Sequence, residues 1–207
     1  YIKVDEYLRN KNKLEPVAVI VTRARMRDSH IIGAGLYDVG DYPFTNSKIW
    51  FNASNNFNTN STDGKVMLNT WKTNAPYYSA TPRSESNRTV LFTEPNFPAI
   101  FKATHYGDVY KTVSGQLCNG WYLPGRSEIL PITYSNSLIR INRTLRLIDG
   151  QTFEYNSDYW TADYAEPDGE GPRCKTLCTP ENENTTEQRD GGEGLIYSTE
   201  IHHVRAV

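Results

Sequence analysis

The residues of this sequence best suited to bind a metal ion lie in one acidic stretch near its C-terminus. Its carboxylates are Asp163, Glu166, Asp168 and Glu170. Carboxylate oxygens are the ligands that a hard cation such as calcium prefers. A solvated acidic loop has the same composition. We therefore expect no metal or other cofactor, and keep calcium at this stretch as the alternative interpretation.

Other residues that could perform chemistry do not form a recognisable catalytic set. His202 and His203 are adjacent, so on a strand they point to opposite faces and cannot chelate one ion. Cys174 and Cys178 would lie roughly 13 Å apart on one strand, too far for a disulfide. Pairing of Cys118 with either of them stays open, as does a set of three thiols. No nucleophile-elbow, zinc-protease or phosphate-loop motif occurs. We predict that the protein is not an enzyme.

Charge is distributed unevenly along the chain. The 207 residues carry a net charge of −2. Residues 1–153 hold 18 basic and 12 acidic side chains, whereas residues 154–207 hold 4 basic and 12 acidic ones. A nucleic-acid-binding protein needs a dominant basic face, so we do not expect nucleic acid as a partner of this chain. No apolar run reaches the roughly 18 residues that a membrane span requires.

The elements that must position these residues are short. Residues 1–15 are charged and predict an arm or short helix that needs a partner surface. The β-branched run 17–21 and the segment 30–36 predict a hairpin. Residues 40–95 are dense in Asn, Ser, Thr and Gly and predict an irregular, divergent insertion. The length indicates one domain, spanning 16–207 after the arm.

Three helices and four strands are expected after the insertion. Asn96 is expected to cap a helix over 97–106. A second helix is expected after Pro124, shortened or bent by Pro131. Residues 137–148 predict an amphipathic helix. The expected strands are 159–162, 173–177, 194–199 and 203–207. Trp121 and Trp160 are expected to anchor the core. The tyrosine-rich segments at Tyr77-Tyr78, Tyr106 and Tyr110 could cover the core or add contact surface.

A set of motifs in fixed order carries a resemblance. The motifs are Asn119-Gly120-Trp121-Tyr122-Leu123-Pro124 with Glu128, then Ile141-Asn142-Arg143-Thr144-Leu145, Asp149-Gly150, Tyr159-Trp160-Thr161-Ala162 and Val204-Arg205-Ala206-Val207. In this order they resemble the bacterial and phage DUF1566-like domains, which have a C-type-lectin-like fold. The resemblance covers residues 16–39 and 96–207. Gly125 departs from it, since a serine is usual there.

The resemblance implies an α+β fold of small antiparallel sheets with two or three helices and long loops, in which the closing strand pairs with the N-terminal one. In such domains the loops between the last strands bind the ligand. Some relatives bind sugars through calcium with a Glu-Pro-Asn or Gln-Pro-Asp motif, which Glu166-Pro167-Asp168 resembles, although the partner Trp-Asn-Asp motif is absent. Others, including the targets of diversity-generating retroelements, bind proteins without metal. Sulfatase-activating oxidases share the fold and need two thiols, for which Cys174 and Cys178 are the candidates.

We therefore expect a non-enzymatic domain that recognises a protein receptor or a glycan and is displayed outside the cell, on a cell surface or a virion, as an adhesin or phage protein would be. The expected contact residues are Tyr155, Tyr159, Asp163, Tyr164, Glu166 and Asp168. The alternative is a structural subunit of a pilus, fibre or phage particle, assembled by docking of the 1–15 arm on a neighbour.

Overall fold

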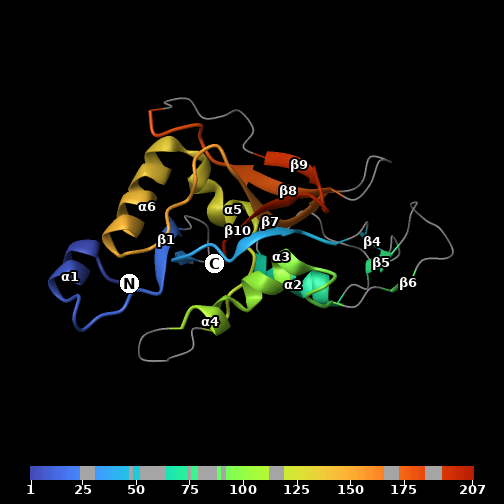
Figure 1. The fold of residues 1–207 in the computed structure, drawn as a ribbon, viewed down its shortest axis with the longest axis horizontal. Coiled ribbons are helices and arrows are strands. Elements are labelled where there is room, and N and C mark those ends of the chain that lie inside the picture. The colour runs from blue at the N-terminus through green and yellow to red at the C-terminus, as the bar shows by residue number, and fades with distance from the viewer. Residues whose placement is uncertain are drawn as a thin grey trace.

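The fold is taken from a computed structural model of the chain. The structure describes residues 1–23, 31–46, 49–51, 64–73, 76–78, 88–89, 92–111, 119–165, 173–184 and 193–207. Every statement below concerns these residues. Figure 1 shows the N-terminal helix and the longest helix together at one end, with a small sheet at the other.

A five-stranded sheet forms the centre of the molecule. Its strands are β3 (Gly40–Pro43), β7 (Asp158–Ala165), β8 (Arg173–Cys178), β9 (Glu193–Tyr197) and β10 (Ile201–Val204), in the order β3-β10-β7-β8-β9. Strands β10 and β7 are parallel, and the other neighbours are antiparallel. Each of the four strands expected after residue 158 therefore exists, with bounds shifted by up to a few residues.

Two smaller sheets accompany the central one. β1 (Ala18–Arg23) and β2 (Ile31–Gly35) pair antiparallel, from Ala18 opposite Gly35 to Arg23 opposite Ile31, which confirms the predicted hairpin. Short antiparallel strands β4 (Ile49–Phe51), β5 (Pro76–Tyr78) and β6 (Arg88–Thr89) form the third sheet. Together with the helices, these sheets make a mixed α+β fold.

The helices are mostly short. They are α1 (Val4–Arg9), α2 (Gly64–Thr73), α3 (Pro98–Thr104), α4 (Tyr106–Val109), α5 (Arg126–Ile129), the 3₁₀ helix η1 (Leu130–Thr133) and α6 (Ser135–Leu147). On α6 the predicted amphipathic pattern is confirmed, because Leu138, Ile141 and Leu145 are buried. The arginines of this helix, Arg140, Arg143 and Arg146, are exposed. Pro131 lies in η1, and the α-helix that follows Pro124 is only the four residues of α5, which confirms the prediction that Pro131 shortens or bends this helix.

Two expectations about helices are wrong. The helix expected over 97–106 is divided at His105 into α3 and α4, and Phe97, not Asn96, holds the cap position without a side-chain cap bond. Residues 64–73, expected to be irregular, form α2. Two of its side chains, Met67 and Trp71, are fully buried, and the Trp71 indole donates to the Ala162 carbonyl at 3.0 Å. A single stripe of core contacts makes this polar segment helical.

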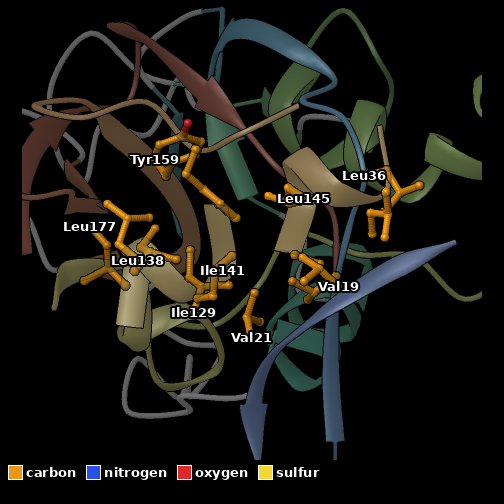
Figure 2. Packing of buried hydrophobic residues seen from close by; sticks show 14 of the residues in the cluster. Val19, Val21, Leu36, Ile129, Leu138, Ile141, Leu145, Tyr159 and Leu177 are labelled. Carbon is orange, nitrogen blue, oxygen red and sulfur yellow. The ribbon is translucent and has the colours of Figure 1, made fainter. Parts of the chain in front are cut away.

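Two clusters of buried side chains hold the elements together. The first lies around Phe44, Trp71, Phe97 and Trp160, with Trp160 donating to the Tyr42 carbonyl at 2.8 Å. The second joins the hairpin, α5, α6 and the sheet, as Figure 2 shows for Val19, Val21, Leu36, Ile129, Leu138, Ile141, Leu145, Tyr159 and Leu177. Trp160 is thus the predicted core anchor, whereas Trp121 is only half-buried at the edge of the first cluster.

Both ends of the chain pack on the body of the fold. Tyr7 of α1 belongs to the second cluster, and Lys11 forms an ion pair with Asp149 just after α6, at 2.7 Å. The partner surface that residues 1–15 require is thus α6 of the same chain. Strand β10 pairs with β3 and β7, so the expected pairing with the N-terminal strand is wrong. Beyond β10, the Ala206 carbonyl accepts a hydrogen bond from the Gly35 N–H at the end of β2, at 2.9 Å.

None of the helices that the structure describes is both long enough and apolar enough to pass through a membrane.

Candidate functional site

The expected contact face contains a core residue. Tyr159 is fully buried, its ring lies 5.1 Å from that of Phe153, and its hydroxyl accepts a hydrogen bond from the Glu154 N–H at 2.9 Å. Burial raises the pKa of this phenol well above its usual value. Tyr155 is half-buried and packs against the second cluster. The expectation that Tyr159 contacts a ligand is therefore wrong, because no face of its side chain reaches solvent.

Asp163 is also part of the scaffold. Its side chain is buried, and Oδ2 accepts a hydrogen bond from the Arg126 N–H, at the start of α5, at 2.7 Å. Burial raises the pKa of this carboxyl, and the bond from Arg126 opposes that shift. An acceptor in this position satisfies a helix N–H that has no partner within the helix. Asp163 thus positions α5, and its buried carboxylate is not offered to a ligand in solution.

The other three expected contact residues lie at or beyond the limit of the described residues. Tyr164 lies on β7 opposite Cys174, and Glu166, Asp168 and Glu170 lie outside the described residues. Within the described ranges, no group of three or more His, Cys, Asp or Glu side chains is placed to hold a metal ion. The calcium alternative for the acidic stretch remains an expectation.

Glu128 explains why the tryptophan motif carries a glutamate four residues after its proline. Its buried carboxylate accepts the Gly125 N–H at 2.7 Å, the Gly64 N–H at 2.9 Å and the Tyr122 hydroxyl at 2.8 Å. One side chain thereby caps α5, fixes the first residue of α2 and holds the tyrosine of the motif. A Cβ on Gly64 would lie 2.4 Å from the Leu123 carbonyl oxygen, so only glycine allows this approach.

The cysteines and histidines of the sheet are also engaged in packing. Cys174 is buried, and burial raises the pKa of its thiol well above the usual value, which disfavours the nucleophilic thiolate. The two histidine rings contact different neighbours, as strand alternation predicts: His202 meets Trp160 edge-on and His203 stacks on Tyr159. His203 Nδ1 lies 2.7 Å from Asp41 Oδ1. Cys118 lies outside the described residues.

A groove lies elsewhere, between the N-terminal segment and the tyrosines of α4. Its volume is about 690 Å³, within the range of roughly 300–1,000 Å³ typical of ligand pockets. Aromatic side chains and lysines from distant parts of the sequence line it, among them Tyr37, Tyr106, Tyr110, Trp121, Lys13 and Lys111. Residues 11–17 form the opposite wall.

The aromatic side chains of the groove form a connected series. The rings of Tyr37 and Tyr110 stack with centroids 5.0 Å apart, and Tyr106 lies 4.6 Å from both Tyr110 and Trp121. The buried Tyr106 accepts the Tyr37 N–H at 3.1 Å, and burial raises its pKa to about 12. The Tyr37 hydroxyl donates to the Asp149 carbonyl and the Tyr110 hydroxyl to that of Asp38, both at 3.1 Å. The hydroxyls thus hold the rings, and the groove is formed in advance of any ligand.

The scaffold beneath the groove is tied by Arg205. This side chain is buried, pairs with Asp38, and donates to the Gly35 and Gln151 carbonyls at 3.0 and 3.1 Å. Asp38 accepts in addition from the Gln151 amide at 3.0 Å. Since Asp38 follows Tyr37 and its carbonyl accepts from Tyr110, the network and the groove share one backbone segment.

Comparisons with models of protein families, with curated proteins and with solved structures find no match for this chain.

The sequence contained part of the signal for this groove. Tyr106 and Tyr110 belong to the tyrosine-rich segments predicted either to cover the core or to add contact surface, and in the structure Tyr106 does the first and Tyr110 lies half-buried in the groove wall. Tyr37 and the lysines of the N-terminal segment carry no pattern of their own. Their part in the groove depends on how 1–17 folds over the end of α6.

Proposed function

We propose that this protein is a non-enzymatic recognition domain, displayed on a cell surface or a virion, that binds a glycan or a protein receptor. The groove is its binding site. The observation that carries the proposal is a groove of about 690 Å³ in which the Tyr37 and Tyr110 rings are fixed by hydrogen bonds of their own hydroxyls. Rigid tyrosine and tryptophan rings bind with little loss of conformational entropy, which is why recognition surfaces favour them.

The engagement of the reactive groups supports binding over catalysis. Glu128 and Asp163 accept backbone N–H groups at helix starts, Arg205 is paired with Asp38, and the Cys174 thiol is buried. A general acid, base or nucleophile must contact a substrate, whereas these groups are hydrogen-bonded to, or buried among, other residues of the fold. The oxidase alternative needs an accessible thiolate, which the position of Cys174 disfavours.

The C-type-lectin-like fold remains part of the proposal. Support comes from the order of the motifs and from the closing strand β10, which lies in the central sheet with the C-terminal residues bonded back to β2. In that fold a rigid base carries the ligand-binding region, and in this chain we place that region at the groove rather than at the 155–193 loops. The structural-subunit alternative relied on a docking arm, and α1 instead packs on α6 of its own chain.

An array of glycans and candidate receptor proteins tests the proposal. Wild-type protein should retain a small set of ligands, and Tyr110→Ala should lose them because it removes one ring of the stacked pair. Tyr134→Ala is the matched control, since Tyr134 is exposed at the other end of α6 and does not line the groove. Binding that survives Tyr110→Ala, or a wild-type protein that assembles into polymers and retains no ligand, would contradict the proposal.

A further inference from the structure

The charge and hydrogen-bonding character of the groove define the class of ligand. Resting on the proposed function, we infer that the groove takes an acidic saccharide: a sugar unit with a flat apolar face and a carboxylate.

The rim of the groove is cationic. Lys11, Lys13 and Lys111 line it, and Glu15 is the one acidic residue among the described residues of its lining. Lys11 is paired with Asp149 at 2.7 Å, so part of its charge is neutralised. Lys13 and Lys111 are exposed, and neither makes an ion pair in the part of the chain that the structure describes. An anionic group arriving at this rim gains a favourable interaction that screening by salt weakens.

The walls of the groove offer rings for stacking. The hydroxyls of Tyr37 and Tyr110 are already bonded to carbonyl oxygens of the scaffold, so these half-buried residues present to the groove the part of their ring surface that their own stacking leaves uncovered. A pyranose ring has a face of C–H groups that lies against such an aromatic surface. A cationic ligand could also lie over these rings, but the lysine rim would repel it. Aromatic walls together with lysines therefore favour a ligand that is an anion and has an apolar face.

Trp121 adds an unsatisfied donor. Its Nε1–H is buried and has no hydrogen-bond partner among the described residues. An indole N–H can only donate, and leaving a buried donor unpaired costs free energy. Because Trp121 lines the groove, a sugar hydroxyl or ring oxygen is the kind of acceptor that would satisfy this donor. Carboxylate, apolar face and acceptor oxygens occur together in uronic and sialic acids.

Two pairs of probes test the inference in the wild-type protein. One is tri-galacturonate and its methyl ester, which has the same ring system without the charge. The other is 3′-sialyllactose and lactose. Titration calorimetry gives the affinities, and tryptophan fluorescence reports the environment of Trp121. We expect at least one acidic probe to bind about tenfold or more tightly than its neutral partner, with an affinity that falls as salt rises.

Charge-neutral variants locate the effect. The double variant Lys13→Gln/Lys111→Gln should lose the preference for the acidic probe. The control variant Arg140→Gln/Arg143→Gln removes the same amount of charge from the exposed face of α6, and it should retain the preference for the acidic probe. Trp121→Phe should weaken binding of the acidic probe and remove the fluorescence response, and the unfolding curve of each variant shows that it folds.

The outcomes separate this inference from the proposed function. If the neutral member of both pairs binds as tightly as the acidic one, or if no probe binds, the inference is overturned. The proposed function then stands or falls with the array and Tyr110→Ala. If an acidic probe binds equally well to the Lys13→Gln/Lys111→Gln variant, the site lies elsewhere and the inference is overturned as well.

Discussion

Arg205 Nε donates a hydrogen bond to Asp38 Oδ1 at 2.5 Å, although the two residues are 167 positions apart in the sequence. Both side chains are buried, and the guanidinium carbon lies 4.4 Å from the centre of the Phe153 ring. The pair joins the last residues of the chain to the segment after β2 and to residues 151–153. Strand alternation alone would place Arg205 of the Val204–Val207 motif on a solvent-facing side. Its pairing with Asp38 accounts for its position inside the protein.

Removing one member of this pair should destabilise the protein strongly. Arg205→Met leaves Asp38 buried without its partner, which costs about 3–5 kcal/mol in comparable buried pairs. Urea unfolding measures the loss, and Arg140→Met, an exposed arginine on α6, should change stability by less than about 0.5 kcal/mol. Asp38→Asn in the Arg205→Met background should recover part of the loss. If Arg205→Met alone were as stable as the wild type, the Arg205–Asp38 pair would not stabilise the fold.

Glu128→Gln should also destabilise the protein, by about 1–3 kcal/mol. An amide has one oxygen in place of two, so it cannot accept from Gly125, Gly64 and Tyr122 in the observed arrangement. Glu6→Gln on the exposed face of α1 makes the same chemical change and should have almost no effect. Thermal and urea unfolding of both variants make the comparison. Equal stabilities for the two variants would be inconsistent with a capping role for Glu128.

His202 should make the folded state sensitive to mild acid. Burial lowers the pKa of this imidazole below its usual value of 6.5, while the nearby Asp158 and Glu200 oppose the shift. Below pH 6.5 the unfolded chain therefore takes up a proton that the folded chain resists. The stability that His202 contributes is present above pH 6.5 and is lost as the pH falls toward its folded pKa. His202→Gln should reduce this slope, measured by urea unfolding from pH 5 to 8. A steeper slope in the variant would contradict a lowered pKa of His202 in the folded state.

Cys174 should be unreactive in the folded protein. Its thiol is buried and its pKa is raised, so little thiolate forms at pH 8. Iodoacetamide treatment followed by peptide mass mapping should find Cys174 unmodified in the native protein and modified in urea. Cys174→Ser should retain ligand binding, because the residue lies in the core and not in the groove. Rapid native labelling of Cys174, or a redox turnover that Cys174→Ser abolishes, would favour the oxidase alternative.

Much of the fold follows from local patterns. The hairpin β1–β2, the buried stripe of α6 and the short strands of the central sheet all have periodicities that the sequence displays. Helix α2 lacked that signal because it lies in a polar, asparagine-rich region and uses few buried positions. The break at His105 and the burial of Arg205 depend on contacts with residues far along the chain, which local patterns do not encode.

The contact face was harder to predict than the fold. Tyr159 and Asp163 have residue types typical of recognition surfaces, and both are buried because β7 is an interior strand of the sheet. Burial on both sides of a central strand depends on which elements cover the sheet. The described residues of the groove come from five separated parts of the chain, represented by Lys13, Tyr37, Tyr110, Trp121 and Ile148. No spacing rule connects such positions, so only the three-dimensional arrangement brings them together.

The location of the binding site is tested most directly by chemical-shift mapping. ¹⁵N-labelled protein would be titrated with the strongest ligand of the array, and the shifted backbone and indole N–H resonances would be assigned. We expect shifts at Tyr37, Tyr110, Lys111 and the Trp121 indole, with the resonances of β7 and β8 unchanged. Shifts confined to residues 155–165 and 173–184, with the groove unaffected, would contradict it.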